Sequence, residues 1–175
     1  PSMGAIDGND DSGPPNERPT VERLYFEVPQ LCRFLTAKVQ KAFYDPFEYL
    51  WARHKGDALK TGFTSALGSV AYQVACHQRV QNIGLKTRDV LNLVDESNVI
   101  AYERCSGHDG TYAVKKETRD KSVKIARPTV RKVDEQAPDR LISDCPMAGE
   151  HLAHLSAKVG KAEHPMTLLR EAYGL

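Results

Sequence analysis

Short apolar runs alternate with longer amphipathic segments along most of this chain. Three runs have the length and side-chain content of buried strands, at residues 68–75, 99–102 and 141–144. Each is followed by a segment whose apolar residues recur at helical spacing, at residues 85–94, 111–136 and 147–159. This alternation predicts a single α/β domain with a mostly parallel sheet and helices on both faces.

Capping residues and prolines indicate where several helices begin or end. Asp45-Pro46 and His164-Pro165 are typical of helix starts, because proline is well tolerated at the first helical position. We expect Asp109 and Gly110 to cap the long helix, and Pro128 to end or kink it.

The start of the chain differs from the rest. Residues 1–20 contain Gly, Asp, Asn and several prolines and have almost nothing to bury, so we expect a disordered leader. Residues 21–42 are interrupted by Pro29 and form a separate N-terminal segment, while residues 43–175 form the α/β domain.

A cysteine follows each of the three predicted strands: Cys76, Cys105 and Cys145. The carboxyl ends of parallel strands meet at one edge of a sheet, where ligands collect. A helix that begins nearby also favours a thiolate through its free N–H groups and dipole. We therefore expect the three thiols to converge on one metal site. Cys32 stands apart and is assigned no function.

Three other interpretations of these cysteines remain open. They are three buried thiols that act as small apolar residues, a structural zinc site with three thiolates and one histidine, or the nucleophile of a thiol enzyme. Spacing does not distinguish zinc from an iron–sulfur cluster. The thiol enzyme is the least favoured, because no signature of a catalytic pair or oxyanion hole accompanies the cysteines.

Composition narrows the class of protein. The chain has 175 residues, 41% of them hydrophobic, and a formal net charge of +1, with Lys and Arg interleaved with Asp and Glu. This charge pattern argues against a nucleic-acid partner. No apolar stretch reaches the roughly 20 residues that span a bilayer, and no signal peptide is recognisable, so we expect a cytoplasmic protein. Four cysteines at this length indicate free or metal-bound thiols rather than disulfides.

Several motifs now justify a comparison with a known family. They are Asp-Pro-Phe-Glu-Tyr-Leu at 45–50, Ala-Cys-His at 75–77, Arg-Cys-Ser-Gly at 104–107, Asp-Cys-Pro at 144–146 and His-Pro at 164–165. Together they make residues 43–175 resemble the cysteine-rich CCG domain found in the B subunit of heterodisulfide reductase and in the C subunit of anaerobic glycerol-3-phosphate dehydrogenase. The similarity is greatest to the C-terminal copy of that domain, and residues 21–42 match nothing in the family.

The resemblance implies an iron–sulfur cluster, of the 4Fe-4S type, held by Cys76, Cys105 and Cys145. Zinc is the alternative that the residues alone leave open. The chain departs from the full family motif at two positions, where Ser106 and Ala148 replace cysteines, so a five-thiolate cluster would lack two ligands. No Cys-x-x-Cys-x-x-Cys run precedes the domain. A site with three thiolates remains chemically sensible, because a fourth position can be taken by histidine, water or a partner.

Residues next to the cysteines are candidates for contacts with the cluster. His77 and His108 are expected to supply a further ligand or hydrogen bonds to cluster sulfur, and Ser106 and Gly107 to supply polar groups and close backbone approach. The two histidines of the 147–159 helix, at 151 and 154, are expected to be exposed.

The predicted function is that of an iron–sulfur electron-transfer domain or subunit in a redox complex like those two families. It would be an oxidoreductase component rather than a complete enzyme, since no Gly-x-Gly-x-x-Gly motif is present to bind a flavin. The expected partners are flavoprotein or ferredoxin-like subunits, with any membrane contact made through them at the cytoplasmic face. The alternative is a degenerate domain without a cluster that acts as a structural or subunit-contact module.

Overall fold

The computed structural model describes residues 33, 35–39 and 42–175, and the chain divides into two units, Pro1–Phe43 and Tyr44–Leu175. The expected leader at 1–20, and most of the segment at 21–42, lie outside the described residues. The second unit carries the sheet and the elements that position the cysteines.

The second unit is organised around a four-stranded sheet with the order β2-β1-β3-β4. Its strands are β1 (Gly68–Gln73), β2 (Ser97–Tyr102), β3 (Arg140–Ser143) and β4 (Ala162–Glu163). Every pair is parallel, and β1 lies between β2 and β3. The predicted α/β fold with a parallel sheet is therefore confirmed.

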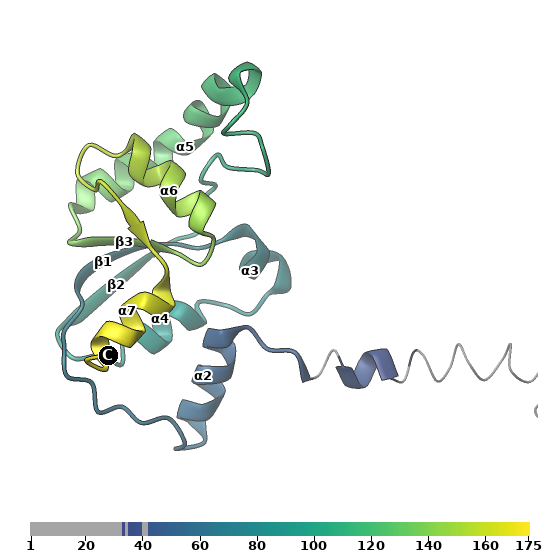
Figure 1. Ribbon diagram of the computed structural model, residues 1–175, viewed down its shortest axis with the longest axis vertical. Coiled ribbons are helices and arrows are strands. Elements are labelled where there is room, and N and C mark those ends of the chain that lie inside the picture. The colour runs from purple at the N-terminus through teal and green to yellow at the C-terminus, as the bar shows by residue number, and fades with distance from the viewer. Residues whose placement is uncertain (1–32, 34, 40–41) are drawn as a thin grey trace, which may run out of the picture. The chain divides into compact units, whose positions relative to one another are not determined.

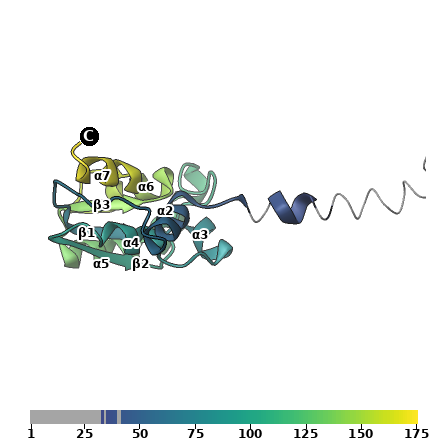
Figure 2. The same cartoon turned by 90° about the horizontal axis from the view of Figure 1, so that it is seen from below.

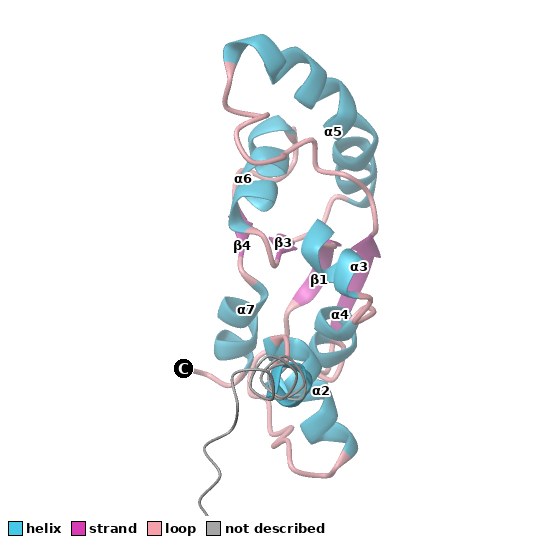
Figure 3. Cartoon of the chain, turned by 90° about the vertical axis from the view of Figure 1, so that its right-hand side faces the viewer, coloured by secondary structure: helices cyan, strands magenta, loops and turns pink. Residues whose placement is uncertain are grey.

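Helices lie on both faces of this sheet (Figure 1). They are α2 (Pro46–Lys55), α3 (Cys76–Gln81), α4 (Lys86–Leu91), α5 (Lys116–Gln136), α6 (Pro146–Leu155) and α7 (Pro165–Ala172). Figure 3 shows the strands as a middle layer, with α5 and α6 on one side and α2, α4 and α7 on the other. In Figure 2, β3, β1 and β2 lie side by side, and α3 lies beyond their ends.

Two helix starts follow directly from their capping residues. Asp45 Oδ1 accepts a hydrogen bond from the Phe47 N–H at 2.9 Å, and His164 Nδ1 accepts one from the Met166 N–H at 3.2 Å. In both helices a proline occupies the first turn, where its missing N–H leaves no unpaired donor. The starts predicted at Asp45-Pro46 and His164-Pro165 are confirmed.

The two faces of the sheet are packed differently. The face toward α2, α4 and α7, called here the large-residue face, buries Val70, Tyr72, Val74 and Ile142 against residues such as Phe47 and Leu168. The face toward α5 and α6, called here the small-residue face, buries Ala71 and Leu141 against a set that includes Ala126, Ala153, Val130, Val133 and Leu152.

Local details differ from the prediction in two segments. The strand expected at residues 68–75 ends at Gln73, and a short helix, α3, begins at Cys76. The long helix begins at Lys116 rather than at residue 111, after turns in which Asp109 O accepts the Tyr112 N–H and Thr111 O accepts the Val114 N–H, so Asp109 and Gly110 do not cap it. Pro128 does not end this helix, which continues to Gln136.

The two edge strands of the sheet, β2 and β4, were the hardest to predict from the sequence. The run at 99–102 was expected to be buried, but β2 is an edge strand and its Ile100 is 38% exposed. The other edge, β4, has only two residues, too few to show a period in the sequence. Among the described residues, no helix is both long and apolar enough to cross a bilayer.

Candidate metal centre

The three cysteines lie at the carboxyl end of the sheet, where its parallel strands finish. Cys76 follows β1, Cys105 follows β2 and Cys145 follows β3, and these are three neighbouring parallel strands. Because the strands are parallel, their carboxyl ends lie on the same side. Cys76 and Cys105 are exposed and Cys145 is half-buried, and all three are free thiols.

Two of the cysteines lie at helix starts. Cys76 is the first residue of α3, and Cys145 is the N-cap of α6. The Cys145 N–H donates a hydrogen bond to Ser143 Oγ at 3.2 Å, and its carbonyl accepts the Gly149 N–H at 3.0 Å. The backbone at Cys145 is therefore fixed from both sides.

The Cys105 segment is held to α5 by two hydroxyl groups. Thr129 Oγ1 donates to the Cys105 carbonyl at 2.8 Å, and Ser122 Oγ donates to the Gly107 carbonyl at 2.7 Å. Gly107 has φ of 77°, and a Cβ there would lie 2.3 Å from the Ser122 carbonyl oxygen. Glycine is thus required both by the backbone conformation and by the contact with α5.

The other predicted neighbours of the cluster have different surroundings. The Gly107 N–H donates to Cys105 Sγ at 3.4 Å. Ser106 is buried, and its Oγ accepts the His108 N–H at 3.3 Å. His77 is exposed and His108 is half-buried.

His151 was expected to be exposed, but it is 8% exposed, and only His154 lies in solvent. His151 Nε2 lies 2.9 Å from Ser122 Oγ. The one hydroxyl proton of Ser122 goes to the Gly107 carbonyl, so His151 Nε2 carries the proton in this contact. Burial, followed by the charge of His108, lowers the pKa of His151.

A buried polar cluster on the large-residue face was not predicted. Its four members are Tyr72, Gln78, Thr87 and Asp144, which come from β1, α3, α4 and the residue before Cys145. The Tyr72 hydroxyl lies 2.6 Å from Asp144 Oδ2 and 2.5 Å from Gln78 Oε1, and Thr87 Oγ1 donates to Asp144 Oδ1 at 3.2 Å. Burial raises the pKa of both Tyr72 and Asp144. This cluster connects the helix that begins at Cys76 to the segment that carries Cys145.

The donor set suits soft metal chemistry, because thiolates at three neighbouring strand ends are the ligands that iron–sulfur clusters and zinc prefer. In the described part of the chain, no three His, Cys, Asp or Glu side chains are grouped closely enough to hold a metal ion. The structure therefore brings the three cysteines to one edge and leaves their side chains apart.

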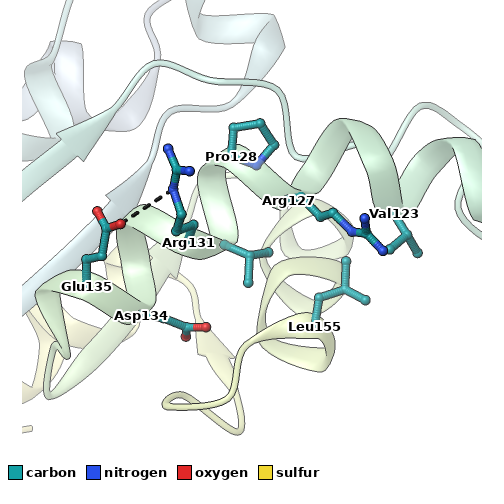
Figure 4. Close-up of a pocket in the computed structure, with 8 residues that line it drawn as sticks. Val123, Arg127, Pro128, Arg131, Asp134, Glu135 and Leu155 are labelled. Atoms are coloured by element: carbon teal, nitrogen blue, oxygen red, sulfur yellow. Dashed lines mark ion pairs between the residues drawn. The ribbon is translucent and has the colours of Figure 1, made fainter.

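A groove between two helices is separate from the cysteines. It has a volume of about 680 Å³ and lies between α5 and the end of α6, where Arg127, Arg131 and Leu155 line it (Figure 4). Arg131 Nε pairs with Glu135 Oε1 at 3.4 Å along α5. None of the cysteines lines this groove.

Comparisons with known proteins bear on the class of domain. Residues 70–152, which include all three cysteines, match the family model of the CCG cysteine-rich domain. The resemblance to the CCG domain is confirmed. The match covers a shorter stretch than the expected 43–175, but it contains most of β1 and all of β2 and β3.

Two curated relatives carry the same name. The C subunit of anaerobic glycerol-3-phosphate dehydrogenase from Escherichia coli K12, and its counterpart from strain O157:H7, are each 31% identical to this chain over 104 residues. The aligned stretch is 59% of this chain and 26% of the relative, so the chain spans about a quarter of each relative's length. No solved structure shows a significant match.

Proposed function

We propose that the CCG segment is an electron-transfer module of a redox complex, with one iron–sulfur cluster held by Cys76, Cys105 and Cys145. The observation that supports this most is the position of the three thiols at the carboxyl ends of three neighbouring parallel strands. The CCG match and the similarity to a dehydrogenase subunit support the same class of protein. A bound cluster of the 4Fe-4S type would supply one-electron transfer.

The chain's own residues have defined tasks in this proposal. The Gly107 N–H donates to Cys105 Sγ and so orients the thiol, while Ser122 and Thr129 fix the backbone on either side of Ser106. His77 and His108 are proposed to complete the ligand set or to hydrogen-bond to cluster sulfur.

The proposed partners are other redox subunits, either flavoproteins or ferredoxin-like proteins. This follows from the relatives' description as one subunit of a dehydrogenase, of which this chain spans only a part. The proposed location is the cytoplasm, with any membrane contact made through those subunits.

Metal analysis of protein prepared without oxygen tests the proposal. We expect iron and acid-labile sulfide in the wild type, and an EPR signal after reduction. Cys105→Ala should lose most of the iron, whereas Cys32→Ala, which changes the cysteine that does not follow a predicted strand, should retain it. Zinc without sulfide would instead support the structural zinc site, and equal iron in both variants would contradict the assigned ligands.

A second candidate function is a subunit-contact module that no longer binds a cluster. Ser106 and Ala148 stand where the full motif has thiols, and Ser106 is buried with its hydroxyl occupied by the His108 N–H. This candidate predicts that the folded wild-type protein contains neither iron nor zinc after anaerobic reconstitution.

A further inference from the structure

The last residue of β1, Gln73, has no exposed surface and lies on the small-residue face beside Ala71. In the sheet register it pairs with Tyr102 of β2 and with Ser143 of β3. It therefore lies at the carboxyl end of the central strand, between the strand that leads to Cys105 and the strand that leads to Cys145. A buried amide is costly unless its donors and acceptor are all paired.

The amide of Gln73 is fully used, and its contacts fix its orientation. Nε2 donates to the carbonyls of Val74 at 2.7 Å and of Arg104 at 3.1 Å. Oε1 accepts the Ser143 hydroxyl at 2.8 Å. Two carbonyls can only accept, so the NH₂ group must face them and the oxygen must face Ser143.

These contacts reach the backbone of two cysteine segments. Arg104 directly precedes Cys105, so one end of the amide holds the Cys105 segment. Ser143 Oγ donates to Gln73 and also accepts the Cys145 N–H at 3.2 Å, so the other end orients Cys145. A single buried side chain thus connects two segments that lie about forty residues apart in the sequence.

We infer that Gln73 is a positioning residue, which sets the Cys105 and Cys145 segments relative to each other so that their thiols can serve one centre. This inference rests on the proposed function, because it concerns the same cysteines. Gln73 does not touch the sulfur atoms in any of its hydrogen bonds, so it acts through Arg104 and Ser143.

Two variants test separately the contact of Gln73 with the Cys105 segment and the contact of Ser143 with Cys145. Gln73→Glu keeps the acceptor for Ser143 but places a carboxylate oxygen against two carbonyls, which should release the Arg104 side. Ser143→Ala removes the hydroxyl that accepts the Cys145 N–H. Gln136→Glu is the matched control, because Gln136 also uses its amide, accepting from the Tyr102 hydroxyl and donating to Ser69 Oγ, without contacting a cysteine segment.

Hydrogen exchange of the metal-free full chain gives a readout that does not depend on a cluster. We expect exchange at the Gly107 N–H to be about tenfold faster in Gln73→Glu, and exchange at the Cys145 N–H to be about tenfold faster in Ser143→Ala, as for the loss of one buried hydrogen bond. Exchange in α4 and α7, on the other face, should not change. Gln136→Glu should leave both cysteine segments as in the wild type.

Iron content then connects this result to the centre itself. After anaerobic reconstitution, Gln73→Glu should hold less than about half the iron of wild type, and Gln136→Glu should hold as much as wild type. Unchanged exchange at Gly107 and Cys145 in both variants would overturn the inference, as would full iron loading of Gln73→Glu. If Gln73→Glu does not fold, Ser143→Ala decides by the same two measurements.

A wild type without iron would defeat the proposed function, while the exchange data would still decide whether Gln73 positions the two segments.

Discussion

On the large-residue face, Tyr72 and Asp144 meet in a buried contact between a phenol and a carboxyl group, whereas on the small-residue face neutral hydroxyls of Ser122 and Thr129 hold backbone carbonyls. Both sets of contacts lie at the edge of the sheet that carries the cysteines. The first depends on burying ionisable groups among large apolar side chains, and the second on how closely α5 approaches the chain around Gly107.

This difference shows that the carboxyl end of the sheet is held by two kinds of interaction, each sensitive to a different kind of substitution. A close backbone approach fails when any atom is added, because the neighbouring main chain cannot move away cheaply. A buried cluster with a carboxyl group fails when one partner is removed, because the remaining polar groups lose both water and hydrogen bonds. Substitutions on the two faces should therefore differ in size and in their dependence on pH.

The largest effect should come from Gly107→Ala on the small-residue face. The new Cβ would meet the Ser122 carbonyl at 2.3 Å in a backbone with φ of 77°, so we expect the free energy of unfolding to fall by roughly 3 kcal/mol or more. Gly110→Ala is the matched control, because Gly110 has φ of 50° but no atom within 4 Å of the added Cβ. Its loss should be about 1 kcal/mol. Equal losses in urea unfolding would show that the approach of α5 is not a constraint.

A smaller loss is expected for Tyr72→Phe on the large-residue face. Removing the hydroxyl takes a hydrogen-bond partner from Asp144 Oδ2 and from Gln78 Oε1, while both side chains keep their contacts with Thr87, and this should cost roughly 2 kcal/mol. The comparison is Tyr102→Phe, whose hydroxyl donates to Gln136 Oε1 at 2.7 Å in a half-buried position. Thermal or urea unfolding of both variants measures the difference, and a loss at Tyr102 as large as that at Tyr72 would contradict the account of the buried cluster.

The smallest effect is a dependence of the folded protein's stability on pH, which arises from His151 on the small-residue face. Burial lowers the pKa of His151 in the folded state below its ordinary value of 6.5, so protons bind the unfolded chain more strongly. The stabilisation is complete above pH 6.5, and it is lost as the pH falls from 6.5 to the folded-state pKa. His151→Gln, which can still donate to Ser122, should remove this part of the pH dependence, whereas His154→Gln should retain it. Stability curves between pH 5 and 8 that match for wild type and His151→Gln would refute the assignment.

Much of the fold was predictable because it depends on local patterns. The three main strands and the helices α4, α5 and α6 follow from apolar periodicity, and the starts at Asp45 and His164 follow from capping residues next to proline. The common position of the cysteines required only the rule that parallel strands end at the same edge.

The polar contacts around the cysteines were not predictable, because each joins residues far apart in the sequence. Tyr72 and Gln73 look like ordinary members of a strand, and their partners Asp144 and Ser143 lie about seventy residues away. His151 looked like an exposed helical residue, because nothing in its own helix shows that Ser122 of α5 covers it. Such partners can be identified only once the packing of α5 on α6 is known.

Pro128 adds a consequence for how the Cys105 segment can move. Proline has no N–H to give to the Lys124 carbonyl, so the main-chain hydrogen bonding of α5 is interrupted there. Ser122, which holds Gly107, precedes this break, and Thr129, which holds Cys105, follows it. Fraying of the first turns of α5 would therefore free Gly107 and its neighbours while the Cys105 carbonyl stays fastened to the second half of the helix.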